Sequence, residues 1–221
     1  MVGICFFAPF AYTDSSLDAL AVRECVFECF GAGELERINN ISNPSGRALS
    51  LGGLIALGRA LREFSPTDQK LTIVRDRFGK PRFECGGASF SIAHAGALSV
   101  AAVSRGDIGV DIERIDTSRD MDRIAGRFFS EGEQKQLSIA EDKTREFYRI
   151  WTAKEAMMKL GGEGMISIMS SDSAMALSSK ERFFAGYEVS FGKEDYILTL
   201  CSKNEEKIEI IECEGLRVLC R

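Results

Sequence analysis

Two acidic residues in the middle of the chain have a spacing that suits metal binding. Asp111 and Glu113 lie two positions apart in the run Ile-Gly-Val-Asp-Ile-Glu that begins at Ile108, and this run has the composition of a β-strand. Alternate residues of a strand face the same side, so the two carboxylates project together and repel each other. A divalent cation relieves such repulsion, and oxygen ligands alone favour Mg²⁺ or Mn²⁺. The alternative is an exposed edge strand in which Arg114 pairs with one of the acids.

A second group of charged residues falls on one predicted helix, in the segment from Trp151 to Lys159. Glu155 and Lys159 are four positions apart and share a helix face, whereas Lys154 points to a neighbouring face. A Glu followed by a Lys at this spacing is also a common surface pair. The tryptophan and two methionines of the segment, however, indicate a largely buried helix. A charged pair beside a buried stripe is expected to line a crevice or to meet a partner charge.

His94 is the single histidine of the chain and lies in the small, apolar segment Ser-Ile-Ala-His-Ala-Gly. One histidine does not make a histidine-based metal site. The side chain could donate to a phosphate group, or it could be a turn residue that backbone groups satisfy. Taken alone, the residue favours the turn.

The composition narrows the class of protein. The chain has 221 residues, 45% hydrophobic and 28% charged, which is typical of a folded globular protein with one large domain or two small ones. Its net charge of −5 argues against non-specific nucleic-acid binding as the main function. Seven scattered cysteines without a CxxC spacing suit reduced thiols in a cytoplasmic protein. The apolar first residues predict a core strand rather than a signal peptide, and no apolar run reaches the roughly 18 residues of a membrane span.

Helical periodicity and turn residues predict the elements that position the charged groups. Apolar spacing indicates helices over 16–30, 47–64, 121–129 and 144–160, and a further helix with Ser130 as N-cap and Glu133 at the capping-box position. Alternating and apolar runs indicate hairpins over 90–103 and 187–201, a short strand or helix end over 70–74, and a last strand pair over 205–220. The polar residues 34–46 predict a turn-rich connection, and residues 75–82 a basic loop.

The order of these elements predicts the fold class. Each half of the chain contains a helix that carries basic residues, followed by a hairpin, and no long linker separates the halves. We therefore expect an α+β protein made of two similar lobes, 1–105 and 106–221, that pack face to face. The repeat is weak at the level of sequence identity.

Five segments in a fixed order give the sequence a family resemblance. They are Phe-Gly-Lys-Pro at 78–81, Phe-Ser-Ile-Ala-His at 90–94, Ile-Gly-Val-Asp-Ile-Glu at 108–113, Arg-Phe-Phe-Ser-Glu-Gly-Glu at 127–133, and the helix segment 147–159. Together they strongly resemble the 4′-phosphopantetheinyl transferases, and most closely the surfactin-synthetase-activating (Sfp-like) type. Asp-x-Glu or the helix segment alone would be a weak signal, whereas the ordered set is specific.

The resemblance implies a fold and a reaction. The fold is a pseudo-dimer of two α/β lobes with the active site in the cleft between them. The enzyme moves the phosphopantetheine arm of coenzyme A to a serine of an acyl or peptidyl carrier protein and releases adenosine 3′,5′-bisphosphate. The reaction is expected to need Mg²⁺, for which Mn²⁺ could substitute, and the length suits a monomer.

The resemblance also assigns roles to individual residues. Asp111, Glu113 and Glu155 are expected to hold the Mg²⁺ that touches the coenzyme A pyrophosphate. Phosphate contacts are expected from His94 and Lys159. The full set expected to bind coenzyme A is Arg47, Lys80, Pro81, Ser91, His94, Lys154 and Lys159.

The chemistry of phosphoryl transfer is consistent with these roles, because it depends on charge neutralisation more than on covalent participation. The serine hydroxyl must lose a proton as it attacks the β-phosphorus. Glu155 is the nearest carboxylate to act as the base, directly or through a metal-bound water. Glu133 is a second candidate, because its segment lies beside the same cleft in the family.

The sequence departs from the family at the histidine, which Ala93 and Ala95 flank where the family usually has serines. Ser91 could substitute if the register shifts. These departures leave open a degenerate homologue that binds coenzyme A or a carrier protein without transfer. An unrelated Mg²⁺-dependent phosphohydrolase would need a phosphate-cradling glycine loop or a clustered Asp/His set, and the sequence has neither. Fatty-acid, polyketide and nonribosomal-peptide carriers all remain open as substrates.

Overall fold

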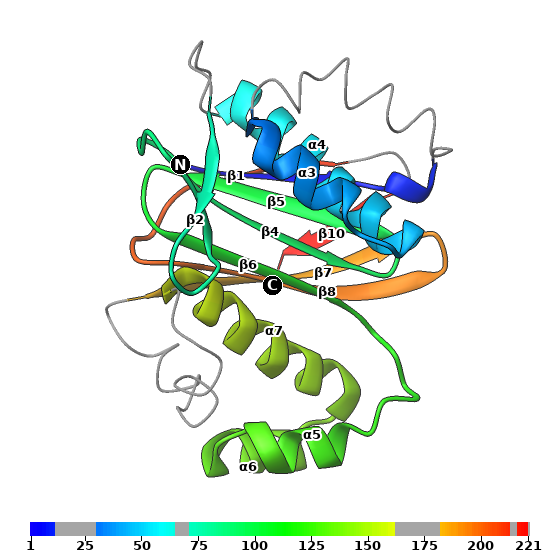
Figure 1. The fold of residues 1–221 in the computed structure, drawn as a ribbon. Helices are drawn as coiled ribbons and strands as arrows, with labels where there is room; N and C mark the ends of the chain where they lie inside the picture. Colours follow the sequence, from blue (N-terminus) through cyan, green and yellow to red (C-terminus); the bar gives the residue numbers. More distant parts are fainter. Residues whose placement is uncertain (12–29, 65–70, 162–181, 213–215, 221) are drawn as a thin grey trace. The chain divides into compact units, whose positions relative to one another are not determined.

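A computed structural model describes residues 1–11, 30–64, 71–161, 182–212 and 216–220. Most of the predicted helix over 16–30 lies outside these residues. Contacts divide the chain into two compact units (Figure 1): the first comprises Met1–Ile108 and Glu206–Glu214, and the second Gly109–Glu205 and Gly215–Arg221. The predicted lobes were 1–105 and 106–221. The structure differs because the late segment Glu206–Glu214 belongs to the first unit.

The first unit is built on a sheet with the strand order β4-β5-β1-β9. Every residue of β1 (Val2–Phe7) is buried, which confirms the core strand expected at the start of the sequence. It pairs antiparallel with β5 (Leu98–Ser104), and β5 pairs antiparallel with β4 (Ser89–Ala95). A tight turn joins β4 to β5 and uses Gly96 at a φ of 51°. The hairpin predicted over 90–103 is therefore confirmed.

The long helix α4 (Pro44–Phe64) packs on this sheet, against β5 and β1 most extensively. Two glycines that lower its intrinsic helix propensity allow the close contact. A Cβ at Gly53 would lie only 2.6 Å from Cγ2 of Ile92 in β4, and one at Gly52 3.0 Å from Oγ of Ser99 in β5. Tertiary packing thus stabilises a helix that its own sequence disfavours.

A short helix, α3 (Ala32–Asn39), occupies part of the segment 34–46 that the sequence predicted to be a turn-rich connection. That prediction was wrong for 34–39, because Ile38 is fully buried in the core and tertiary contact stabilises the helix, and it was also wrong for 44–46, which begin α4. Glu34 is buried as well, and its carboxylate accepts hydrogen bonds from Arg37 (2.8 Å) and from Arg75 (2.5 Å). Arg75 begins the predicted basic loop, so part of the basic charge of this loop is already neutralised.

The basic loop itself joins two short strands, β2 (Ile73–Arg75) and β3 (Pro81–Phe83), which pair antiparallel. Oδ1 of Asp76 accepts hydrogen bonds from the backbone N–H groups of Phe78 (2.8 Å) and Lys80 (3.0 Å). Gly79, between them, has a φ of 84°, a conformation that favours glycine. The loop that carries Lys80 and Pro81 is therefore ordered by its own aspartate. A 3₁₀ turn, η1 (Pro9–Ala11), follows β1.

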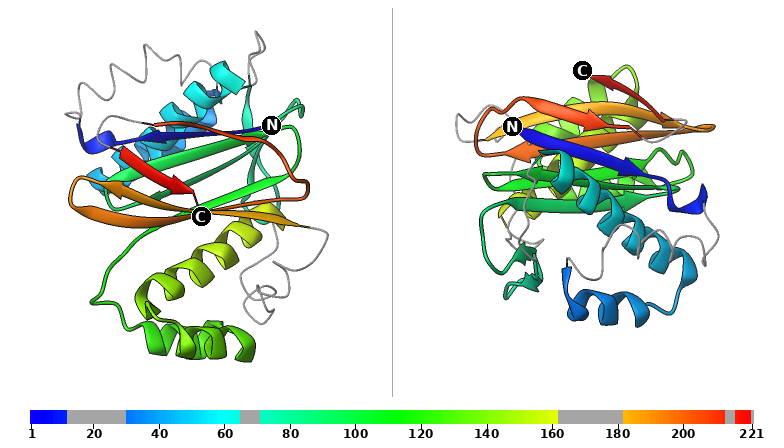
Figure 2. Two further views of the ribbon diagram at one scale, coloured as in Figure 1. Left: turned by 180° about the vertical axis from the view of Figure 1, so that it is seen from behind. Right: turned by 90° about the horizontal axis from the view of Figure 1, so that it is seen from above.

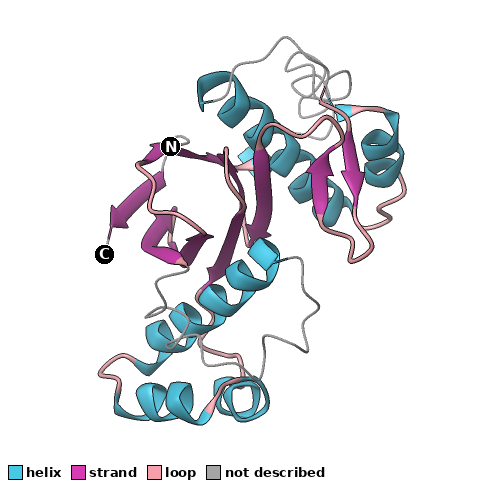
Figure 3. Ribbon diagram, turned by 90° about the vertical axis from the view of Figure 1, so that its left-hand side faces the viewer, coloured by secondary structure: helices cyan, strands magenta, loops and turns pink. Residues whose placement is uncertain are grey.

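The second unit has the strand order β10-β7-β8-β6. After β6 (Ile108–Arg114) come three helices, α5 (Met121–Phe128), α6 (Glu131–Ile139) and α7 (Lys143–Gly161). Next, β7 (Phe183–Phe191) and β8 (Glu194–Ser202) form the second predicted hairpin, whose turn contains Gly192 at a φ of 62°. The helix α7 packs on β8. In each unit a long helix therefore lies against a sheet (Figure 3).

The two units share one order of elements, which confirms the α+β class. A strand, a long helix and a hairpin follow one another in each unit, and the sheet orders β4-β5-β1 and β7-β8-β6 correspond. The two strands predicted over 205–220 are present, but they do not pair with each other. The strand β9 (Ile208–Ile211) pairs in parallel with β1, and β10 (Leu216–Cys220) pairs antiparallel with β7, in the other sheet (Figure 2). The positions of β9 and β10 are therefore determined by pairing with strands that are distant in the sequence. Within the described residues, no helix combines the length and apolar character needed to cross a bilayer.

Candidate active site

A close approach between β6 and α7 creates the setting of the candidate site. A Cβ at Gly109 would lie 2.0 Å from the carbonyl oxygen of Ala156 and 2.6 Å from the backbone nitrogen of Leu160. Both are backbone atoms of α7 and cannot rotate away, so only glycine fits at this position. The contact brings the acidic positions of β6 next to the charged positions of α7.

Hydrogen bonds link the two predicted charged groups to each other. Nζ of Lys159 donates to Oδ1 of Asp111 at 2.8 Å, and Nε1 of Trp151 donates to Oε1 of Glu113 at 3.2 Å. The strand pair and the helix pair, predicted separately, therefore belong to one site. Arg114 does not neutralise either acid, because its guanidinium pairs with Glu194 at 2.7 Å.

A residue that the sequence analysis missed completes this group. NH1 of Arg119 lies 3.6 Å from Oε2 of Glu113. We call Asp111, Glu113, Glu155, Lys159 and Arg119 the open cluster. Arg119 stands in the polar run Asp-Thr-Ser-Arg-Asp, which has no periodicity and no motif to single it out.

The carboxylates of the open cluster are close enough to shift each other's protonation. Burial and the neighbouring Asp111 raise the pKa of Glu155 to about 7, while Lys159 acts in the opposite direction. Burial and Asp111 also raise the pKa of Glu113 above its ordinary value. Glu155 makes no hydrogen bond or ion pair with any described residue. Proximity of like charges in a partly buried site is the condition that a bound cation relieves.

The donor chemistry of the open cluster fits a hard divalent cation, since three carboxylates supply oxygen ligands only. The side chains as they stand are not arranged to coordinate a metal ion. No three Asp, Glu, His or Cys side chains among the described residues are gathered so as to hold a metal ion as they stand. Lys159 holds Oδ1 of Asp111, while the buried Oδ2 accepts no hydrogen bond from a described residue. Binding of a cation would therefore require these carboxylates to draw together.

Two predicted site residues form a separate, fully buried ion pair, which we call the closed cluster. Nζ of Lys154 lies 2.7 Å from Oε2 of Glu133, and their side chains are 1% and 0% exposed. Glu133 also accepts from the backbone N–H of Ser130 in the predicted capping box, which is confirmed. Side chains so enclosed cannot touch a substrate. The structure thus contradicts Glu133 as a base and Lys154 as a coenzyme A contact, and it gives both a role in joining α6 to α7.

The remaining predicted residues lie in the first unit. Arg47 is in the first turn of α4, Pro81 begins β3, and Lys80 precedes it in the ordered loop. His94 is exposed on β4, whereas Ser91 on the same strand is 5% exposed. Residues three positions apart on a strand face opposite sides, so Ser91 does not stand beside His94. The expectation that Ser91 replaces the missing serines is wrong for this register.

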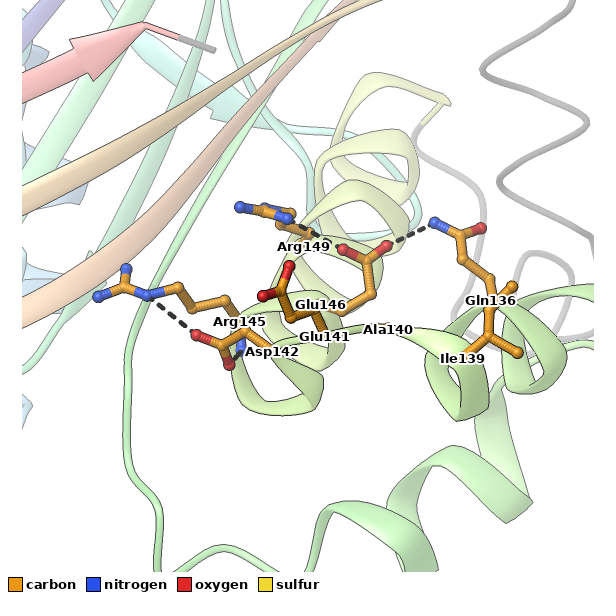
Figure 4. Close-up of a pocket in the computed structure, with 8 residues that line it drawn as sticks. All are labelled: Gln136, Ile139, Ala140, Glu141, Asp142, Arg145, Glu146 and Arg149. Carbon is orange, nitrogen blue, oxygen red and sulfur yellow. Dashed lines mark hydrogen bonds and ion pairs between the residues drawn. The ribbon is translucent and has the colours of Figure 1, made fainter.

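A hollow of about 600 Å³ lies elsewhere in the second unit, at the junction of α6 and α7 (Figure 4). Four of its charged side chains, Asp142, Arg145, Glu146 and Arg149, already take part in ion pairs. Glu146 accepts from Gln136 (2.5 Å) and Arg149 (3.0 Å), and Arg145 pairs with Asp142 (3.4 Å). These pairs largely neutralise the charge of the lining, so we do not assign chemistry to this hollow.

Comparison with known proteins decides the family. Residues 107–201 match the model of the 4′-phosphopantetheinyl transferase superfamily. The 4′-phosphopantetheinyl transferase AcpT of Salmonella typhimurium is 33% identical over 150 residues, which cover 65% of this chain and 75% of AcpT. This chain belongs to the 4′-phosphopantetheinyl transferase superfamily. The transferase HetI of Nostoc is 28% identical over 173 residues (72% of this chain, 68% of HetI). Sfp of Bacillus subtilis is 31% identical over 119 residues (52% of each chain), in line with the Sfp-like type.

The superfamily match coincides with the open cluster. Its range, 107–201, contains β6, α5, α6 and α7 and therefore all five members of that cluster. The expected coenzyme A contacts of the first unit lie outside the range. For this 4′-phosphopantetheinyl transferase, the residues of the second unit are thus the best supported part of the site.

Proposed function

We propose that this transferase takes 4′-phosphopantetheine from coenzyme A and attaches it to a serine of an apo carrier protein. The products are a holo-carrier protein and adenosine 3′,5′-bisphosphate. The observation that carries the proposal is the open cluster: three mutually coupled carboxylates and two cationic side chains at the contact between β6 and α7. Such a group suits a substrate that brings phosphate charge together with a divalent cation.

The carboxylates of Asp111, Glu113 and Glu155 would hold Mg²⁺. When bound, the ion would neutralise charge on the diphosphate of coenzyme A. Lys159 lies on the same side and would offset the negative charge that develops on the departing phosphate oxygen. Its present hydrogen bond to Asp111 keeps the ammonium beside the carboxylates, ready to exchange one anionic partner for another.

Glu155 is the base that the structure supports best. Transfer forms a bond from the serine oxygen to the β-phosphorus, breaks the bond to the adenosine 3′,5′-bisphosphate oxygen, and releases the hydroxyl proton. Asp111 and Glu113 each accept a hydrogen bond from α7, whereas Glu155 makes none with a described residue, so its carboxylate oxygens are available to accept the proton. The enclosure of Glu133 removes the other candidate. In the first unit, Arg47, Lys80, Pro81 and His94 stay as proposed contacts of the nucleotide.

Intact-mass spectrometry tests the proposal directly. The protein is incubated with coenzyme A, Mg²⁺ and a panel of apo carrier proteins from fatty-acid, polyketide and nonribosomal-peptide synthesis. Addition of one phosphopantetheine group to a carrier, abolished by omitting coenzyme A or by chelating Mg²⁺, is the expected result. The panel also shows whether the enzyme is of the holo-acyl-carrier-protein synthase type. Binding of coenzyme A without transfer to any carrier would instead indicate a degenerate homologue.

A further inference from the structure

Arg119 occupies a fixed position next to the open cluster. The turn that carries it, between β6 and α5, is tied to α7 through Tyr148, whose hydroxyl accepts from Asp116 N (3.0 Å) and donates to Asp116 O (3.1 Å). Oδ1 of Asp116 in turn accepts from the backbone and hydroxyl of Ser118 at 2.9 and 2.6 Å. The guanidinium carbon of Arg119 lies 5.7 Å from the centre of the Tyr148 ring. Both the backbone and the guanidinium of Arg119 are therefore positioned by α7.

The guanidinium is near a carboxylate but does not hydrogen-bond to it. NH1 is buried and has no hydrogen-bond partner among the described residues. Its 3.6 Å separation from Oε2 of Glu113 gives attraction between charges but is too long for a hydrogen bond. Lys159 differs, because its ammonium donates to Asp111 at 2.8 Å. Buried donors are seldom left unsatisfied, so the arrangement calls for a further acceptor.

The chemistry of that acceptor follows from the donor. A guanidinium presents a planar fork of N–H groups that matches two oxygens of a phosphate, and Arg119 is 35% exposed and so remains reachable. A cation held by Glu113 would weaken the attraction between Glu113 and Arg119. An anionic group that binds together with the cation would then accept hydrogen bonds from the guanidinium of Arg119.

We propose that Arg119 binds the diphosphate of coenzyme A. The inference rests on the proposed function, since it names the part of that substrate which Arg119 contacts. The carrier protein is the weaker alternative, because the guanidinium lies beside Glu113, a proposed ligand of the cation that accompanies the diphosphate. Arg119 thereby supplies a third positive group to the diphosphate, in addition to the metal and Lys159.

Calorimetric titration of coenzyme A into the whole protein with Mg²⁺ tests the role. Arg119→Met keeps the length of the side chain and removes the charge, whereas Arg119→Lys keeps the charge and removes the fork. We expect Arg119→Met to weaken coenzyme A binding about ten- to hundredfold, and Arg119→Lys to weaken it less. Arg123→Met is the matched control, because Arg123 is exposed in the first turn of α5, four residues after Arg119. This variant should bind coenzyme A as tightly as the wild type.

Titration of Mg²⁺ alone separates a substrate contact from a structural role. If Arg119 binds the diphosphate, Arg119→Met should bind Mg²⁺ at least as tightly as the wild type, because a competing cation has been removed. Loss of Mg²⁺ affinity by the same factor as coenzyme A affinity would overturn the proposal and make Arg119 a positioning residue for Glu113. A lower melting temperature with unchanged coenzyme A binding would also overturn it.

The Michaelis constants distinguish the remaining outcomes. A raised constant for the carrier protein with an unchanged constant for coenzyme A would assign Arg119 to the carrier surface and contradict the proposal. Unchanged coenzyme A binding in Arg119→Met, with normal binding by the wild type, would contradict Arg119 alone. Failure of the wild type to bind coenzyme A would contradict the proposed function itself.

Discussion

Neighbouring residues of α7 belong to two charged clusters with opposite properties. Lys154, in the closed cluster, meets one carboxylate in a fully buried pair, and the same oxygen of that carboxylate accepts the capping-box hydrogen bond from Ser130 N. Glu155, in the open cluster, stays partly exposed among three carboxylates that only two cationic side chains face. The closed cluster is balanced in charge, whereas the open cluster lacks one positive charge. Charge balance, more than burial, therefore separates the structural ion pair from the proposed binding site in this protein.

The largest effect on stability is expected in the closed cluster. Glu133→Leu should lower the free energy of unfolding by about 3–5 kcal/mol, because it removes the carboxylate that pairs with the buried ammonium of Lys154. Urea denaturation measures the change. The double variant Glu133→Leu with Lys154→Met is the control and should recover most of the loss. A single variant that costs under about 1 kcal/mol would show that this pair does not hold α6 to α7.

The open cluster should show the reverse: a large effect on transfer and a small one on the fold. Asp111→Ala should reduce the rate of transfer by at least about a hundredfold, since it removes a proposed metal ligand and the partner of Lys159. The melting temperature without metal should change little, because the lost hydrogen bond is offset by less repulsion on Glu113 and Glu155. Transfer near the wild-type rate at saturating Mg²⁺ would remove Asp111 from the site.

The contact between β6 and α7 gives an intermediate effect. Gly109→Ala should destabilise the protein by about 1–3 kcal/mol, because the added methyl group overlaps the backbone of α7. Gly186→Ala in β7 is the matched control, since a Cβ there meets no atom within 4 Å. This second change should stabilise the protein by about 0.5–1 kcal/mol through the lower entropy of the unfolded chain. Equal melting temperatures for the two variants would argue against the close approach.

The pH dependence of stability tests the coupling of the carboxylates in the open cluster. The pKa of Glu155 is raised from 4.5 to about 7 in the folded protein. Between these two values the folded state keeps a proton that the unfolded chain has released, so the free energy of unfolding falls as pH rises through this window. In metal-free buffer, Glu155→Gln should therefore become more stable relative to wild type towards pH 8, and the difference should vanish near the lower end. Parallel melting curves at every pH would contradict the coupling of the carboxylates.

Local patterns in the sequence predicted the elements that carry the site. The spacing of Asp111 and Glu113, the helix face of Glu155 and Lys159, and the capping box of Ser130 all depend on periodicity within one element, and the structure contains each of them. Patterns within one element did not, however, indicate the ion pair of Glu133. The capping box was identified, but only tertiary structure shows that Lys154 closes it.

Features that depend on distant contacts could not be predicted in this way. Arg119 stands in a turn without periodicity, and only the fold brings it to Glu113. The late strands have apolar residues suited to a hairpin, yet each adds to an existing sheet edge. Polar residues of α3 resemble a loop until the burial of Ile38 is known.

The placement of β9 and β10 has a consequence for the order of folding during synthesis. The sheet of the first unit includes β1, which begins at Val2, and β9, which begins at Ile208, so their pairing joins residues 206 positions apart. The second sheet also receives its edge strand β10 late. Neither sheet can be completed until nearly all of the described chain has left the ribosome, and loop closure of this length slows folding. The first sheet then exposes the unpaired edge of β1 from the synthesis of β5 until β9 emerges, which makes self-association of the nascent chain a specific hazard for this topology.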